Sequence, residues 1–209
     1  GRLMQPKTGM LAMTVRAYVR KPVRPVVFVP IYFGYERLVE GRTYIGELSG
    51  RPKEKESVIG MLRTLPELRS RFGKVYVSFG QPLPLDDLLE RHVPGWDRQQ
   101  PVTEEKPAWL SPLCVDLAHQ IMTRINAAAC VTPVNLMGTV LLATPRQRMG
   151  EADLARQLEL YASLMRQAPY SPRVWVTPLD GQSMIRHCDS LRMLYRQSHP
   201  LGDIVGMSE

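Results

Sequence analysis

The chain has 209 residues, of which 44% are hydrophobic and 22% charged, and these shares are ordinary for a globular protein. No apolar run approaches the roughly 20 residues that span a bilayer, and the start of the chain lacks a signal-peptide pattern. The three cysteines, Cys114, Cys130 and Cys188, have no Cys-x-x-Cys spacing, which argues against a disulfide framework or a zinc site. We therefore expect a reducing, cytosol-facing location.

The net charge of +7 is unevenly distributed along the chain. Residues 1–80 hold 15 Lys and Arg against 6 Asp and Glu, a balance of +9, whereas residues 81–209 hold 12 against 14, a balance of −2. The basic first part indicates an anionic partner. Charge alone fits a phosphate, coenzyme A, an acidic carrier protein, anionic lipid or nucleic acid.

The first predicted elements are a helix and a strand. Met10–Arg20 carries apolar residues at helical spacing. Arg24–Glu36 follows, with branched and aromatic residues between two prolines, and predicts a short strand that is buried on both faces. Pro30 cannot donate a ladder hydrogen bond, so regular pairing should stop near it. Tyr35 and Glu36 place polar groups at the end of this strand, which is where ligands bind in open α/β sheets.

A second strand is predicted after two helices. The helices are expected over Thr43–Ser49 and Val58–Leu68. Lys74–Phe79 alternates apolar and polar residues, which is typical of a strand. The order helix, strand, helix, strand indicates a parallel α/β unit. Residues 24–34 and 74–80 should therefore be neighbouring parallel strands.

The second half of the chain is predicted to be mainly helical. Asp86 or Asp87 is expected to cap a short helix that runs through His92, and a linker covers residues 94–107. Four further helices are expected, over Leu113–Ala129, Pro133–Thr144, Glu151–Gln167 and Gln182–Tyr195. The last residues, from Gly202 to Glu209, resemble a strand that has just begun.

These elements predict an α/β fold with a partial parallel sheet and flanking helices, followed by a mainly helical region. We place the boundary between the two parts near residue 100, so that residues 1–100 form the α/β part and residues 101–209 the helical part. The chain opens without an initiator Met and ends within a strand pattern, so we expect a piece of a longer protein that is truncated at its C-terminal end.

Several short motifs occur in a fixed order: Val29-Pro30-Ile31-Tyr32-Phe33-Gly34-Tyr35-Glu36, Tyr76-Val77-Ser78-Phe79-Gly80-Gln81-Pro82, Pro107-Ala108-Trp109-Leu110, Arg124-Ile125-Asn126 and Pro169-Tyr170-Ser171. The first motif resembles the fourth conserved block of glycerol-3-phosphate acyltransferases of the large bacterial membrane-associated type. The other motifs extend this likeness across nearly the whole chain, as do Tyr44, Glu47-Leu48 and Lys53–Ser57. Gly1-Arg2 with Pro6–Gly9 resembles the end of the family's third block.

The resemblance implies acyl transfer from acyl carrier protein or a coenzyme A thioester to the first hydroxyl of glycerol 3-phosphate, the first step of phospholipid biosynthesis. It also implies that the family's catalytic His-Asp pair lies upstream of Gly1. We therefore expect an internal fragment that contains no catalytic residue and is inactive alone. No cofactor and no metal are expected.

Six residues are implied as substrate-binding: Arg2, Pro30, Tyr35, Glu36, Lys53 and Lys55. Arg2 would donate to the substrate phosphate, Pro30 would shape the strand end, and Tyr35 with Glu36 would line the mouth of the pocket. The two lysines would hold the phosphates of the acyl donor or an acidic carrier. Plainer interpretations are a terminal arginine without a role and a solvated run of charges.

The sequence also contains one histidine and aspartate at the spacing of a catalytic dyad. His92 and Asp97 have the H-x-x-x-x-D spacing of the family's general-base dyad, in which the carboxylate orients the imidazole. This spacing is common by chance, and it follows the central strand here, so we do not assign the pair as catalytic. His119, His187 and His199 lack a nucleophile or ligand partner at useful spacing.

Two other functions fit the basic first part. A nucleic-acid-binding α/β module is one, but residues 1–80 show no basic stripe interleaved with aromatic residues, so we expect no nucleic-acid partner. A surface that lies on anionic lipid is the other, and it is compatible with the acyltransferase. We therefore expect peripheral association with the cytoplasmic face of the bacterial cell membrane.

Overall fold

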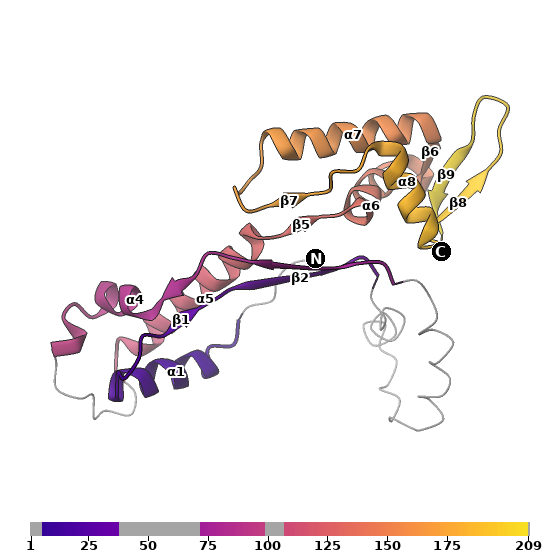
Figure 1. The fold of residues 1–209 in the computed structure, drawn as a ribbon. Helices are drawn as coiled ribbons and strands as arrows, with labels where there is room; N and C mark the ends of the chain where they lie inside the picture. The colour runs from indigo at the N-terminus through magenta and orange to yellow at the C-terminus, as the bar shows by residue number, and fades with distance from the viewer. Residues whose placement is uncertain (1–5, 38–71, 99–106, 209) are drawn as a thin grey trace, which may run out of the picture. The chain divides into compact units, whose positions relative to one another are not determined.

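The computed structural model describes residues 6–37, 72–98 and 107–208, and Figure 1 shows the course of the chain. These residues form six α-helices and several short strands, so the α/β class predicted from the sequence is confirmed. The chain divides into two compact units. The first takes its described residues from Gly1–Tyr32, Val77–Ala129 and Ser171–Arg173, and the second from Phe33–Tyr76, Cys130–Tyr170 and Val174–Glu209. The domain boundary near residue 100 stays a prediction.

Among its described residues, the first unit contains three α-helices and the strand pair of β1 and β4. Its elements are α1 (Gly9–Arg20), β1 (Val27–Phe28), β4 (Leu83–Pro84), α4 (Leu85–His92), the 3-10 helix η1 (Trp96–Arg98) and α5 (Leu110–Ala127). β1 and β4 pair antiparallel, with Phe28 opposite Leu83. The helices predicted at the N-terminus, up to His92 and after residue 112 are confirmed as α1, α4 and α5.

Leucine side chains form the centre of the first unit. α4 contributes Leu85, Leu88 and Leu89, and α5 contributes Leu113 and Leu117. Each of these side chains is at most 1% exposed. Burying one leucine stabilises a fold by about 1.5–3 kcal/mol, so this cluster is the main source of stability in the unit.

Tyr18 connects α1 to the first turn of α4. Its hydroxyl donates a hydrogen bond of 2.6 Å to Asp86, and its ring lies 5.5 Å from the ring of Trp96. Burial, together with the hydrogen bond to Asp86, raises the pKa of Tyr18 to about 12, so the phenol keeps its proton at neutral pH. The prediction that an aspartate caps α4 is wrong, because the capping position is Pro84, without a side-chain hydrogen bond.

Pro30 interrupts the central strand, as predicted. β1 ends at Phe28, and the chain resumes a strand only at β2 (Ile31–Tyr35). β2 pairs with β3 (Val75–Phe79), which confirms the second predicted strand. The missing N–H of Pro30 accounts for this break in the ladder.

β2 and β3 run antiparallel, so the prediction of parallel neighbours is wrong. The N–H of Glu36 donates to the carbonyl of Lys74 at 3.2 Å, and the N–H of Gly80 donates to the carbonyl of Pro30 at 2.8 Å. The residue numbers therefore rise along one strand as they fall along the other. The chain leaves β2 and enters β3 at the same end of the pair, whereas a parallel crossover returns to the opposite end.

One face of β3 is apolar and exposed. Val75, Val77 and Phe79 are each at least 50% exposed, whereas Tyr76 and Ser78 between them are half-buried. The preceding strands repeat the pattern, with exposed apolar side chains at Val27, Val29, Phe33 and Tyr35. The central strand is therefore covered on one face only by the described residues, and the prediction that both faces are buried is wrong.

The second unit contains three helices and five short strands among its described residues. The elements are β5 (Cys130–Val131), α6 (Pro133–Ala143), the 3-10 helix η2 (Pro145–Gln147), β6 (Arg148–Gly150), α7 (Glu151–Gln167), β7 (Trp175–Val176), α8 (Gly181–Ser190), β8 (Leu194–Gln197) and β9 (Ile204–Met207). β5 and β7 form a parallel pair, and β9 lies antiparallel between β6 and β8.

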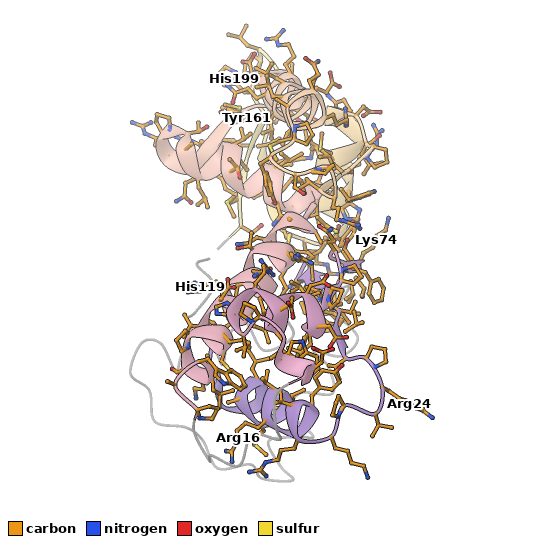
Figure 2. All side chains as sticks on the ribbon, turned by 90° about the vertical axis from the view of Figure 1, so that its left-hand side faces the viewer. Arg16, Arg24, Lys74, His119, Tyr161 and His199 are labelled. Atoms are coloured by element: carbon orange, nitrogen blue, oxygen red, sulfur yellow. The ribbon has the colours of Figure 1, made fainter. Side chains whose placement is uncertain are left out.

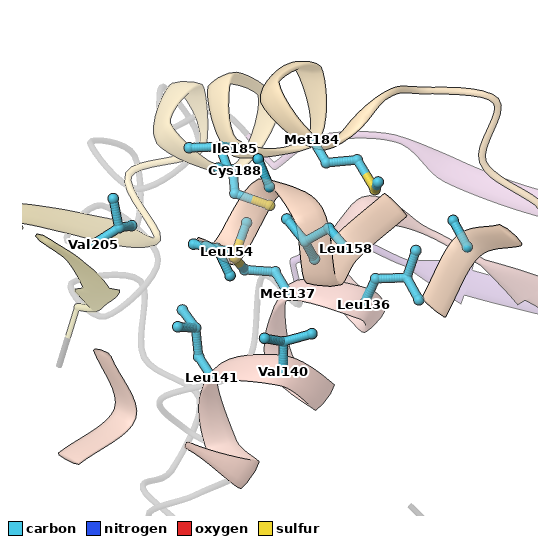
Figure 3. Packing of buried hydrophobic residues seen from close by; sticks show 12 residues of the cluster. Leu136, Met137, Val140, Leu141, Leu154, Leu158, Met184, Ile185, Cys188 and Val205 are labelled. Atoms are coloured by element: carbon cyan, nitrogen blue, oxygen red, sulfur yellow. The ribbon is translucent and has the colours of Figure 1, made fainter. Parts of the chain in front are cut away.

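Figure 3 shows the core of the second unit, in which α6, α7 and α8 pack together. Leu154 and Leu158 of α7 and Met184 of α8 are fully buried. A side chain at Gly181 would place its Cβ only 2.1 Å from the backbone oxygen of Ala155. Glycine at the start of α8 therefore permits the close approach of α8 to α7.

The helices predicted over Pro133–Thr144 and Glu151–Gln167 are confirmed as α6 and α7, and the predicted C-terminal strand is confirmed as β9. The helix predicted up to Tyr195 ends earlier, at Ser190. Arg192 takes a positive φ of 56°, which a continuing helix does not allow, and the chain then enters β8. The helices predicted over residues 43–49 and 58–68 lie outside the described residues.

The exposed strand face and the leucine core should respond differently to substitution. Val77→Thr keeps the branched shape, so we expect the free energy of unfolding to change by less than about 0.5 kcal/mol. Leu89→Ala removes buried methyl groups and should lower the free energy of unfolding by about 2–5 kcal/mol. Urea denaturation of the 209-residue chain measures both values. A loss above about 2 kcal/mol for Val77→Thr would show that this face is covered.

Candidate functional site

Three of the predicted substrate-binding residues lie outside the described residues: Arg2, Lys53 and Lys55. The other three, Pro30, Tyr35 and Glu36, all lie along the central strand. Pro30 is buried, and its carbonyl oxygen accepts the hydrogen bond from Gly80. Tyr35 is 54% exposed, whereas Glu36 is 4% exposed. Tyr35 is the last residue of β2 and Glu36 is the residue after it, so the chain passes within one residue from an exposed side chain to a buried one.

Glu36 is the centre of a buried group that we call the carboxylate cluster, formed by Glu36, Lys74, Tyr76 and His187. The Glu36 side chain is fully shielded from solvent. Its Oε2 accepts the backbone N–H of Lys74 at 2.8 Å, and its Oε1 accepts the hydroxyl of Tyr76 at 2.9 Å. Nε2 of His187 lies 2.9 Å from both oxygens. A carboxylate accepts hydrogen bonds only, so this nitrogen carries the proton.

Three separate segments bring the carboxylate cluster together, and all belong to the second unit. Glu36 follows β2 directly, Tyr76 is the second residue of β3, and His187 lies on α8. α8 is fixed at its start by Asp180, which accepts the N–H of Ser183 at 2.7 Å. This side-chain cap satisfies a backbone donor that the first turn leaves free.

Gly73 makes room for the buried carboxylate. Its φ is +75°, and a Cβ at this position would lie 2.4 Å from Oε2 of Glu36. A larger residue would have to displace the carboxylate or the backbone. Gly73 therefore both turns the chain into β3 and presents the N–H of Lys74 to Glu36.

The carboxylate cluster also changes its titratable neighbours. Burial, and then the hydrogen bond and charge of Glu36, raise the pKa of Tyr76 well above its usual range, so Tyr76 remains a hydrogen-bond donor. Burial, and then the charges of Glu36 and Asp189, raise the pKa of Cys188 to about 12, so Cys188 remains a thiol at neutral pH. Neither group is an activated nucleophile.

This arrangement defines what Glu36 can do. Its two oxygens meet donors from three residues of the protein, which compensates the cost of burying a charge. The carboxylate therefore does not act as a base or as a direct ligand while these contacts persist. Its role is structural: the carboxylate holds the end of β2 against α8.

A second contact supports the same attachment. Nη1 of Arg37 donates to the carbonyl of Leu191, just beyond α8, at 3.3 Å. The ring of Tyr76 lies 5.1 Å from that of Trp175 on β7. The residues at and after the end of β2 are thus attached to α8 at two points, and β3 is attached to β7 at one.

The sequence did not reveal the pairing of Glu36 with His187. The two residues are 151 positions apart, and a spacing motif links only residues that are close in the sequence. The available signal was Glu36 itself, because an acid directly after an apolar strand needs donors if it is buried. That signal indicates that partners exist, but it does not identify them.

His92 pairs with a residue other than the one the spacing motif suggested. Its Nε2 lies 3.0 Å from Oδ2 of Asp116 on α5, whereas Asp97 is exposed in η1. The hydrogen bond from His92 lowers the pKa of Asp116. The His92–Asp97 spacing therefore does not form a dyad, in agreement with our decision not to assign it as catalytic.

Other candidate features are weaker. A hollow of about 350 Å³ is lined by Met149, Asp153, Arg156, Gln157 and Leu160, and its arginine and aspartate form an ion pair with each other. Among the described residues, no three His, Cys, Asp or Glu side chains are grouped to hold a metal ion. The described helices include none with the length and apolar character needed to cross a bilayer.

Comparison with known proteins identifies the family of this α/β chain. A family model described as the glycerol-3-phosphate acyltransferase C-terminal region matches residues 44–209. The glycerol-3-phosphate acyltransferase of Xanthomonas axonopodis pv. citri strain 306 is 52% identical over 209 residues, which are 100% of this chain and 24% of the relative. That of Xylella fastidiosa strain M12 is 48% identical over 206 residues, 98% of this chain and 24% of the relative.

The protein of the same name from Pseudomonas aeruginosa strain LESB58 is 45% identical over 209 residues, which are 100% of this chain and 25% of the relative. These matches place the chain among the acyltransferases. It belongs to the glycerol-3-phosphate acyltransferase family, in the region that the family model describes as C-terminal. The chain spans about a quarter of the length of these relatives.

Removing the charge of Glu36 should destabilise the second unit. Glu36→Gln keeps the size of the side chain but turns an NH₂ group toward donors, so we expect the free energy of unfolding to fall by at least about 2 kcal/mol. Glu90→Gln is the matched control, because the exposed Glu90 accepts only the N–H of Gly95 among the hydrogen bonds recorded for it. Its loss should stay below about 1 kcal/mol. Equal losses in urea denaturation would contradict the special role of Glu36.

Proposed function

We propose that this chain is part of an enzyme that transfers an acyl group from a thioester to glycerol 3-phosphate. The observation that carries the proposal is the match of residues 44–209 to the acyltransferase family model. The identity of 45–52% to three named glycerol-3-phosphate acyltransferases, over almost the whole chain, supports it. The same matches favour an acyltransferase over a nucleic-acid-binding module.

The reaction needs a base, a nucleophile and stabilisation of an oxyanion. The base deprotonates the first hydroxyl of glycerol 3-phosphate, the oxygen attacks the thioester carbonyl, and the thiolate of the acyl carrier protein or coenzyme A leaves. We place this base outside the 209 residues. The resemblance to the acyltransferase family supports this placement, because it implies that the catalytic His-Asp pair lies upstream of Gly1.

We assign this chain a role in substrate binding. Tyr35 presents an exposed phenol at the end of the central strand, next to the buried anchor Glu36. Arg2, Lys53 and Lys55 add positive charge in the basic first part, which suits two phosphate-bearing substrates. The proposed site therefore combines an anchored strand end with the positive charge of the basic first part.

We also propose that the protein lies on the cytoplasmic face of the bacterial membrane. The acylated product is amphiphilic, so release into a bilayer is favourable. Exposed cations at Arg20, Lys21 and Arg24, the last of which extends from the surface in Figure 2, support binding to anionic lipid. Each such cation contributes about 1 kcal/mol near an anionic surface.

An acyl-transfer assay tests the proposed function. The full-length protein that carries these residues should convert glycerol 3-phosphate and an acyl thioester into acylglycerol 3-phosphate, whereas the 209-residue chain alone should not. His92→Ala in the full-length protein should leave the turnover number within a few-fold of the wild-type value, because His92 is not assigned as the base. Loss of the true general base would reduce the turnover number by about a hundredfold or more. No product from the full-length protein would refute the function, and a hundredfold loss for His92→Ala would refute our assignment of the base.

The lysines of the basic first part should affect substrate binding. In the full-length protein, Lys53→Ala combined with Lys55→Ala should raise the Michaelis constant for glycerol 3-phosphate or for the acyl donor several-fold, and the effect should shrink at high salt. Arg146→Ala combined with Arg156→Ala removes the same charge outside the basic part and should leave both constants unchanged. If the lysine variant also leaves both constants and membrane binding unchanged at low salt, the lysines form only a solvated surface.

A further inference from the structure

The donors to Glu36 differ in where they come from along the chain. Lys74 and Tyr76 belong to the segment that pairs with β2, so their contacts hold Glu36 within one two-stranded ribbon. His187 belongs to α8 and is the donor that connects this ribbon to a helix. Its removal would leave the carboxylate with two donors but without a partner on α8.

The imidazole of His187 is placed so that it can orient the carboxylate of Glu36. Nε2 of His187 lies at the same distance, 2.9 Å, from both oxygens of Glu36, so a single N–H faces the middle of the carboxylate. Tyr76 and Lys74 each hold one oxygen. Three donors in this arrangement restrict rotation of the carboxylate and, through it, the backbone at the end of β2.

The surroundings of His187 allow its role to be separated from folding. Its side chain is 19% exposed, while Met184 and Cys188 on the same helix are fully buried in the core. A substitution at His187 therefore removes a hydrogen bond at the edge of the core and leaves the leucine and methionine packing in place. The contact of Arg37 with Leu191 also remains.

We propose that His187 is a positioning residue for the acyltransferase reaction, which acts through Glu36 to fix Tyr35 in the orientation that binds glycerol 3-phosphate. This inference rests on the proposed function. Tyr35, the last residue of β2, and Glu36 are adjacent in the chain, and the first is 54% exposed whereas the second is 4% exposed. Fixing the buried side chain consequently fixes the direction of the exposed one.

The test uses the full-length protein with glycerol 3-phosphate and one acyl thioester. His187→Ala should raise the Michaelis constant for glycerol 3-phosphate about tenfold, a loss of about 1.4 kcal/mol in binding. The turnover number and the Michaelis constant for the thioester should change less than twofold. His187→Gln places an amide N–H near the position of Nε2 and should restore the glycerol 3-phosphate constant to within about threefold of the wild type.

His119→Ala is the matched control, because His119 is an exposed histidine on α5 (Figure 2). It should leave all three constants unchanged. A double-mutant cycle of His187→Ala with Glu36→Gln adds a second measurement, in which the two effects on the glycerol 3-phosphate constant should be strongly non-additive, because both variants remove one interaction.

Three outcomes would overturn the proposal. In the first, His187→Ala leaves the glycerol 3-phosphate constant unchanged in an active enzyme. In the second, His187→Ala and His187→Gln lower activity equally and only in proportion to the folded fraction measured by thermal denaturation, which indicates a merely structural contact. In the third, the thioester constant rises instead. Absence of activity in the wild-type protein would instead refute the proposed function, so the two failures are distinguishable.

Discussion

The constraint on which the second unit depends is the burial of one carboxylate. A charge without solvent is tolerated only when donors surround it, and Glu36 obtains them from a backbone N–H, a phenol and an imidazole. Each donor sets a further requirement. Gly73 has to lack a side chain, Tyr76 has to stay protonated, and α8 has to present His187 at the end of β2. Several local features of the fold thus follow from one buried group.

The features that the sequence predicted well are those decided by nearby residues. Apolar spacing identified the helices that became α1 and α7, and the missing N–H of Pro30 identified the break between β1 and β2. The predicted direction of β3 relative to β2 was wrong, because the direction depends on the end of the sheet to which the chain returns. A helical pattern between two strands is compatible with return to either end.

The candidate site likewise has features that nearby residues decide and features that distant residues decide. The position of Tyr35 and Glu36 at a strand end follows from the local pattern, whereas the burial of Glu36 depends on residues far away in the sequence. His187 could not be selected among four histidines, because its partner lies 151 residues away and hydrogen bonds over that separation leave no spacing signal. The exposure of one face of the strand also could not be predicted, because the elements that cover a strand are not encoded in the strand itself.

The end of β2 joins a buried contact directly to an exposed side chain in this protein. Tyr35 is exposed and Glu36 is buried, and one peptide bond joins the residue that has three donors to the residue that faces solvent. A flexible loop in that place would lose entropy when it bound a ligand, by about 1–2 kcal/mol for each residue that became fixed. The carboxylate cluster fixes the backbone before any ligand arrives. Under the role proposed for Tyr35, the anchoring of β2 to α8 would contribute to binding at a surface that His187 itself does not touch.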